Sequence, residues 1–90
     1  MCRNIRVLYN FAPPATADEI EAAALQYVRK VSGVTRPSAA NEAAFAEAVR
    51  AITRATATLL DGLVTTATPK DRATEAAKAK LRAARRYATG

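Results

Sequence analysis

The sequence predicts an all-α protein, with an antiparallel helical hairpin, a looser third helix and a short N-terminal arm. Two long stretches repeat apolar residues at helical spacing, and helix start and stop signals bracket those stretches. Much of the hydrophobic half of the 90 residues is alanine, which is the best helix former but adds little volume. This pattern favours closely packed helices over a sheet. We expect one helical domain over residues 1–90.

The N-terminal arm, residues 1–15, is ambiguous. Alternate residues from 5 to 11 are apolar, as in a strand, whereas Ile5, Leu8 and Phe11 are spaced three apart, as in a tight helical turn. A lone strand would leave its backbone groups unpaired in a helical monomer. We therefore favour a short helical or irregular arm that places these three side chains on the core. A strand would be expected if two chains paired edge to edge.

The first helix is predicted over residues 16–32. Thr16 and Glu19 fit a capping box, in which each side chain bonds the backbone N–H of the other residue. Five apolar residues then share one helix face, and two cations occupy the last turn, where the helix dipole favours positive charge. Gly33 follows as a left-handed cap.

The second helix is predicted over residues 38–66, after a short turn that should return it against the first helix. Ser38 is its expected N-cap, and an apolar stripe continues for about five turns. Gly62 lies inside this stripe, where it would end the helix early, kink it, or allow another backbone to approach.

The third helix is predicted over residues 69–88, with Thr68 as N-cap and Pro69 at the first helical position. Its apolar face consists of Ala73, Ala77, Leu81, Ala84 and Ala88, so most of this face is alanine. Only Leu81 and Tyr87 supply volume on this helix. We therefore expect it to be the loosest element, or to need a partner.

The expected core consists of the larger apolar side chains of the arm and the first two helices: Phe11, Tyr27, Val28, Val31, Phe45, Val49, Ile52, Leu59 and Leu60. So few large side chains leave a small core. A homodimer that shares the stripe of the second helix is therefore expected.

Composition restricts the function classes. Fourteen Lys and Arg against eight Asp and Glu give a net charge of +6, which favours an anionic partner such as nucleic acid or a phosphorylated ligand. The alternative is that the charge serves solubility alone. A single cysteine and no histidine exclude an intramolecular disulfide and a Cys/His metal cluster within one chain. We expect no catalytic residues, no metal site and no cofactor, and an enzyme is disfavoured.

No secretory signal and no apolar run long enough to span a bilayer are seen in the sequence. A cytoplasmic location without a membrane partner is expected.

The turn between the first two helices is the first candidate site. Arg29, Lys30 and Arg36 surround the predicted N-terminus of the second helix, where Ser38 would add a hydroxyl donor to an anion. The alternative is structural: two cations that complement the dipole of the first helix, a cap, and a solvated arginine. The turn is not a P-loop, since it has one glycine and no Gly-Lys-Ser/Thr ending. It is also a poor match for a DNA-binding helix-turn-helix.

The basic third helix is the second candidate site. Four cations lie roughly on one side of it, namely Lys78, Arg82, Arg85 and Arg86. Such a face can bind phosphates through counterion release, or it can simply be solvated.

Cys2 is the third candidate. Removal of Met1 would leave an adjacent α-amine and thiol that chelate a metal or act as a nucleophile. The alternative is an incidental thiol.

Five segments carry a resemblance to a known family: MCRNI, NFAPPAT, AAALQYVRKVSG, RPSAANEAAF and LVTTATPKDR. They cover nearly the whole chain, which resembles a small bacterial family catalogued only as a domain of unknown function. The resemblance implies a stand-alone protein of about this length, with no described activity. It also implies that Cys2 and the turn belong to the family's pattern.

Two function classes follow: a binding module for an anionic partner, or a helical protein for protein–protein interaction or homo-oligomerisation. Thiol or metal chemistry at Cys2 is a third.

Overall fold

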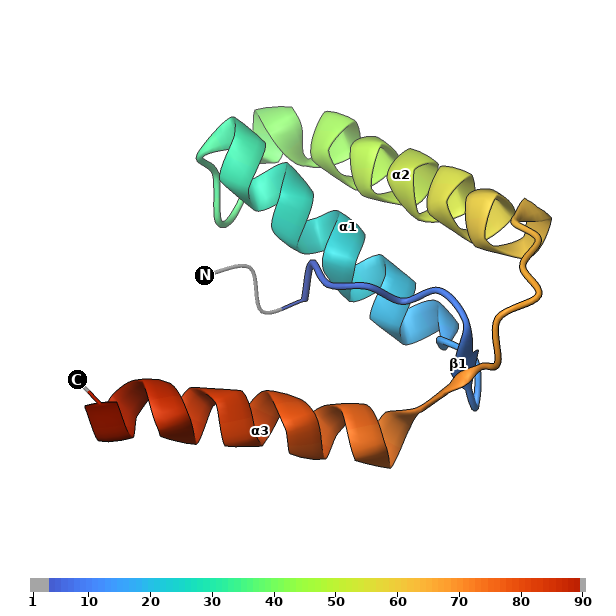
Figure 1. The fold of residues 1–90 in the computed structure, drawn as a ribbon. Coiled ribbons are helices and arrows are strands. Elements are labelled where there is room, and N and C mark those ends of the chain that lie inside the picture. Colours follow the sequence, from blue (N-terminus) through green and yellow to red (C-terminus); the bar gives the residue numbers. More distant parts are fainter. Residues whose placement is uncertain (1–3, 90) are drawn as a thin grey trace.

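The computed structural model describes residues 4–89, with side chains through residue 86. The elements follow in the order β1 (Phe11–Ala12), α1 (Ala17–Ser32), a 3-10 turn η1 (Ala39–Asn41), α2 (Glu42–Gly62), β2 (Lys70–Asp71) and α3 (Arg72–Thr89). Helices α1 and α2 form an antiparallel hairpin, the N-terminal arm crosses α1, and α3 extends from one end of the hairpin (Figure 1). The protein is all-α apart from the two short strands.

Helix α1 has the ends that the sequence predicts. The Thr16 hydroxyl accepts a hydrogen bond from the Glu19 N–H at 3.2 Å, and the Glu19 carboxylate accepts one from the Thr16 N–H at 2.9 Å. Gly33 ends the helix at φ 72°, with its N–H donating to the Arg29 carbonyl at 2.9 Å. A residue with a Cβ is strained at this φ, so glycine suits the position. The capping box and the left-handed cap are confirmed.

Helix α2 is shorter than the predicted range of 38–66 at both ends. Ser38 precedes the 3-10 turn and makes no side-chain cap hydrogen bond; its hydroxyl instead accepts a hydrogen bond from the Asn41 side-chain amide at 3.1 Å. At the other end, the chain leaves the helix after Gly62, with Leu63 in an extended conformation. Of the three roles considered for Gly62, the early end is the one observed.

The buried core is a single ridge on α1. Ile20, Ala24 and Val28 are the only buried hydrophobic residues within the described part of the chain. They are spaced four apart, which matches packing against one neighbouring helix. Five predicted core residues are instead half-buried: Phe11, Phe45, Val49, Ile52 and Leu60.

Three predicted core residues are exposed: Tyr27 by 49 %, Val31 by 69 % and Leu59 by 56 %. Tyr27 and Val31 were wrongly placed in the core because α2 is the helix that packs on α1, and it covers a narrower strip than the whole apolar face. Leu59, on the last turns of α2, is likewise left uncovered.

The arm is irregular from residue 4 to residue 10 and is held by side chains. Gln26 accepts hydrogen bonds from the backbone N–H groups of Asn4 at 2.8 Å and Ile5 at 3.1 Å. The Ile5 side chain, which was expected on the core, is 42 % exposed.

A two-residue parallel pairing of β1 with β2 follows, with Phe11 opposite Lys70 and Ala12 opposite Asp71. The sequence interpretation found no partner for a strand in the monomer, and this pairing corrects it. Asn10 enters the pairing at φ 62°, a conformation that asparagine tolerates. Its side-chain amide donates to the carbonyls of Ala67 and Thr68, each at 3.3 Å.

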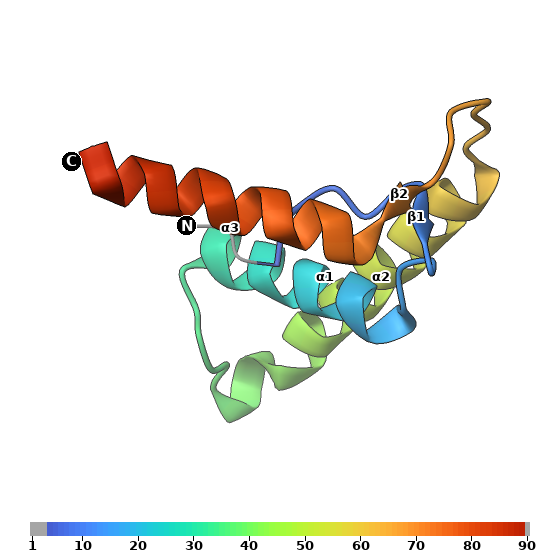
Figure 2. The ribbon, with the colours of Figure 1, turned by 60° about the horizontal axis from the view of Figure 1, so that its bottom comes forward.

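Helix α3 begins at residue 72 rather than at 69, because residues 70 and 71 form β2. Asp71, not Thr68, caps it: the Asp71 carboxylate accepts hydrogen bonds from the N–H and the hydroxyl of Thr74, both at 2.8 Å. These bonds lower the pKa of Asp71. Helix α3 runs apart from the hairpin and extends past the end of α1 (Figures 1 and 2). No helix in residues 4–89 is long and apolar enough to cross a membrane.

The predicted apolar face of α3 points away from the rest of the protein. Ala73, Ala77, Leu81 and Ala84 are all exposed, and Leu81 is exposed by 52 %. Residues on the opposite half of the helix, including Arg72, Ala76 and Ala79, line a groove. The looseness expected for α3 is therefore observed.

Candidate anion-binding groove

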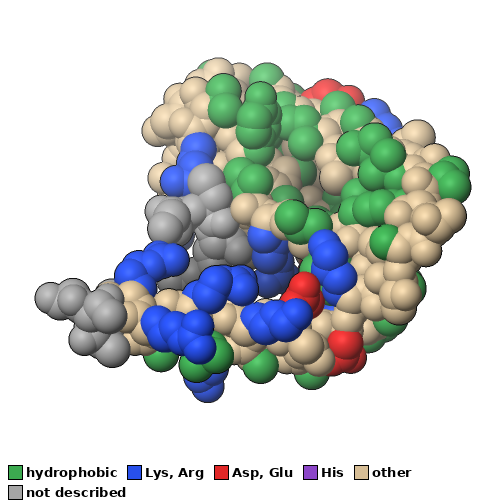
Figure 3. All heavy atoms as spheres, in the orientation of Figure 1, with side chains coloured by type: hydrophobic (Ala, Val, Ile, Leu, Met, Phe, Trp, Pro, Cys, Tyr) green, Lys and Arg blue, Asp and Glu red, His purple; other side chains and the backbone are tan. Residues whose placement is uncertain are grey.

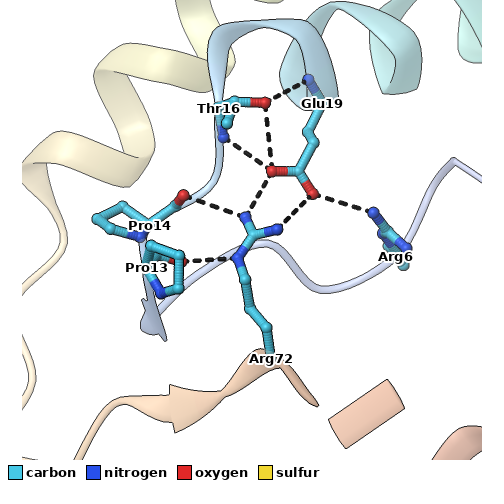
Figure 4. A network of polar contacts seen from close by, with 6 residues as sticks. All are labelled: Arg6, Pro13, Pro14, Thr16, Glu19 and Arg72. Atoms are coloured by element: carbon cyan, nitrogen blue, oxygen red, sulfur yellow. Dashed lines mark hydrogen bonds and ion pairs between the residues drawn. The ribbon is translucent and has the colours of Figure 1, made fainter.

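Arg72 fastens the start of α3 to the start of α1. Its guanidinium donates to the carbonyl of Pro13 at 2.7 Å and to that of Pro14 at 3.1 Å. It also forms a two-pronged ion pair with the Glu19 carboxylate. Figure 4 shows the planar guanidinium directed at both carbonyls and at both carboxylate oxygens. This geometry uses the fork of donors that arginine has and lysine lacks.

Glu19 also holds the start of α1 and the arm. Its carboxylate completes the capping box with Thr16 and pairs with Arg6 at 3.0 Å. The hydrogen bond from Arg72 and the backbone N–H of Thr16 lower the pKa of Glu19 to about 2, against partial desolvation. The same contact raises the pKa of Arg72. Both groups are therefore charged at neutral pH.

The low pKa of Glu19 predicts how the contact depends on pH. The ordinary value is 4.5 and the folded value is about 2, so the ion pair contributes its full stability above pH 4.5. That contribution falls as the pH drops from 4.5 towards 2. We expect an NMR titration of the Glu19 side-chain carboxyl to give a midpoint near 2. In the Arg72→Ala variant the midpoint should rise towards 4.5; an unchanged midpoint would contradict the assignment.

A groove of about 680 Å³ lies between the arm and α3. Its lining is Arg6, Val7, Leu8, Phe11, Glu19, Lys70, Arg72, Glu75, Ala76, Lys78, Ala79 and Arg82. Five of these side chains are cationic and two are acidic. Figure 3 shows Lys and Arg side chains gathered along α3 and around the hollow between α3 and the hairpin. The groove therefore carries an excess of positive charge.

The cations of the groove differ in how they are held. The Lys70 ammonium lies 5.2 Å from the centre of the Phe11 ring, within the range of a cation–π contact. Lys78 pairs with Glu75 at 3.4 Å. For Arg82, no hydrogen bond or ion pair is found among residues 4–89. The groove thus contains cationic side chains that are held to different degrees, together with the aromatic ring of Phe11.

The residues of the predicted turn site do not all line one cavity among the described residues. Arg29 and Lys30 are exposed near the end of α1 and line a smaller cavity of about 280 Å³, together with Asn4 and Gln26. Arg36 is exposed in the loop, and neither Arg36 nor Ser38 lines that cavity.

The predicted basic face is also divided. Lys78 and Arg82 line the groove, whereas Arg85 and Arg86 are exposed further along α3 and do not line it. Cys2 lies outside the described residues. Within the described part of the chain, no group of three potential metal-ligating side chains is found.

The sequence interpretation did not single out Arg6, Lys70 or Arg72 as site residues. Arg72 carried a usable signal, since it falls in the first turn of the predicted third helix, where the helix dipole disfavours a cation. An arginine in that position indicates a partner elsewhere in the fold. Arg6 and Lys70 have no comparable signal in the local pattern.

Fold and site together define a small basic helical protein with a cationic groove between its arm and its last helix. Over residues 1–78 the chain matches the family described as uncharacterised conserved protein DUF2277, and it belongs to that family. The matched range contains every lining residue of the groove except Ala79 and Arg82. Searches of curated proteins and of solved structures each found no match.

Proposed function

We propose that the protein is a binding module for a phosphorylated small ligand, held in the groove between the arm and α3. The observation that carries the proposal is the lining of the groove, in which five cationic side chains outnumber two carboxylates. Phosphate groups are favoured ligands of such clusters, because charge-assisted hydrogen bonds from arginine and lysine are among the strong ones.

The existing contacts indicate which cations are available. Glu19 is already bonded to Arg72 and Arg6, and Arg72 directs its donors at Glu19 and two carbonyls. Arg72 therefore shapes the groove rather than binding the ligand. Among the described residues, no hydrogen bond or ion pair of the Arg82 side chain is found, and Lys78 is held by an exposed ion pair with Glu75. Such exposed pairs contribute little, so Lys78 exchanges its partner for a phosphate at low cost.

The remaining lining favours a ligand with an apolar or aromatic part. The arm side of the groove is formed by Val7, Leu8 and Phe11. Part of the α3 side is formed by Ala76 and Ala79. Ligand sites typically combine such apolar walls with a few polar groups, in cavities of about 300–1,000 Å³. The 680 Å³ groove falls inside that range. A nucleoside phosphate has both features.

A nucleic acid is the second anionic partner that the charge suggests. Single-stranded nucleic acid is usually bound through several aromatic side chains along a basic track. The groove has one aromatic ring, Phe11, which favours the small ligand.

The test is calorimetric titration of the full chain with adenosine triphosphate and, separately, with a single-stranded oligonucleotide. We expect the nucleotide to bind, and Arg82→Ala to weaken binding by roughly tenfold or more. Arg54→Ala is the matched control, because it removes one exposed arginine from α2, outside the groove. It should leave the affinity unchanged.

Three results would contradict the proposal. The first is that the nucleotide fails to bind. The second is that the two variants weaken binding equally, which would indicate that net charge alone attracts the ligand. The third is that only the oligonucleotide binds, with a steep salt dependence.

A further inference from the structure

We infer that a second copy of this chain packs against the apolar C-terminal end of α2 and forms a homodimer. The apolar patch at this end consists of Leu59 on α2 and of Leu63 and Val64 just beyond it, which are exposed by 56 %, 43 % and 93 %. None of these residues lines the groove. The inference is therefore independent of the ligand-binding proposal.

The accessible surface is too large for a compact monomer. The chain exposes 6995 Å², whereas a compact monomer of 9.6 kDa exposes about 5,100 Å². The radius of gyration is 16.0 Å, compared with about 12 Å for a compact domain of this length. The extents of 45 × 38 × 15 Å describe a thin, open molecule. The excess surface is about 1,900 Å² relative to the compact expectation.

That excess is enough for a stable interface. A standard protein–protein interface removes about 800 Å² from each partner. The groove accounts for part of the excess surface. The exposed outer face of α3 accounts for another part, and the uncovered end of α2 belongs to the remainder.

The hairpin geometry explains why the end of α2 is uncovered. Helix α2 has 21 residues and α1 has 16, so they are about 32 and 24 Å long. The two helices run antiparallel from their connecting turn, and the last turn or so of α2 extends past the start of α1. Figure 3 shows hydrophobic side chains gathered across the front of the hairpin and towards this end.

The low charge of this end favours a second copy as the occupant. Each chain carries +6, so two copies repel wherever their basic surfaces meet. From Leu59 to Thr68, Asp61 is the only charged residue. Two copies therefore approach with least repulsion at this end. A strongly acidic or basic partner would find almost no charge to pair with here.

The pairing we infer is a two-fold one, with the ends of the two α2 helices packed against each other. Two-fold dimers use the same patch on both chains, and Leu59 on α2 with Leu63 just beyond it can meet its own copy in this way. The groove on α3 stays open in this arrangement.

Sedimentation equilibrium of the full chain at micromolar concentration tests the inference. We expect the mass of two chains, and Leu59→Arg should weaken the dimer by roughly a hundredfold or more, since it places a charge in the buried centre. Leu81→Arg is the matched control: Leu81 is exposed by 52 %, close to the 56 % of Leu59, but it lies on α3. This variant should remain a dimer.

Thermal melting supplies a second readout that needs no variant. The melting temperature of a dimer rises with protein concentration, while that of a monomer does not. A one-chain mass together with a concentration-independent melting temperature would overturn the inference. Dissociation by Leu81→Arg but not by Leu59→Arg would also overturn it. Far-ultraviolet circular dichroism confirms that each variant is folded.

Discussion

Replacing Arg72 with alanine should release α3 from the hairpin while α1 and α2 stay folded together. Arg72 bonds the carbonyls of Pro13 and Pro14 and the Glu19 carboxylate, and these contacts join α3 to the rest of the fold. Near the start of α3, the described residues add the two-residue pairing of β1 with β2 and the contacts of Asn10. A two-residue ladder is too short to hold a helix alone.

Hydrogen exchange read by mass spectrometry measures this release. We expect exchange of the first α3 amides to accelerate by roughly tenfold or more in Arg72→Ala, because charge-assisted hydrogen bonds are lost. Amides in the middle of α1 should not change. Arg72→Lys should release α3 nearly as much, since lysine keeps the charge but not the planar fork.

Arg50→Ala is the matched control for the release. It removes an arginine from an ion pair with Glu47 on α2, at 3.0 Å, in which both side chains are more than half exposed. Such a pair contributes little to stability. Unchanged α3 exchange in Arg72→Ala, or equal acceleration in Arg50→Ala, would contradict the role of Arg72.

Replacing Ile20 with alanine should lower the free energy of unfolding by about 2–5 kcal/mol. Ile20 is 8 % exposed and is one of the three buried residues between α1 and α2. Its removal leaves a void that the remaining ridge of Ala24 and Val28 cannot fill. The expected loss is a large share of the roughly 5–15 kcal/mol that stabilises a typical domain.

Urea denaturation followed by circular dichroism measures that loss. The protein concentration is kept fixed, because the apparent stability of a dimer depends on it. Val31→Ala is the control on the same helix. Val31 is 69 % exposed, so its truncation should change the free energy of unfolding by less than about 0.5 kcal/mol. Equal losses in the two variants would show that the buried ridge does not dominate the stability.

Local signals predicted the three helices and the hairpin, but neither the strand pairing nor how much of each helix face is covered. The capping box of Thr16 and Glu19 and the cap at Gly33 involve neighbours in sequence, so the pattern itself contains them. The apolar face of α1 is equally visible, but periodicity does not say how many helices will cover it. For that reason Tyr27 and Val31 were wrongly placed in the core.

For a related reason, only some of the residues that line the groove could be predicted from the sequence. Lys78 and Arg82 were identified from the basic face of the third helix, and both line the groove. Arg6 and Lys70 line it only because the arm and β2 come together there. The contact of Arg72 with Glu19 spans 53 residues, and no local spacing rule covers such a distance.

The two roles of the Glu19 carboxylate, at the start of α1 and in the contact with α3, have a thermodynamic consequence. The same two oxygens close the first turn of α1 through Thr16 and hold α3 through Arg72. Fraying of that first turn therefore loosens α3, and detachment of α3 weakens the turn. The free energies of the two events are not additive. Together with the pairing of β1 with β2, this one side chain couples α1 to α3, between which no buried core is found in the described part of the chain.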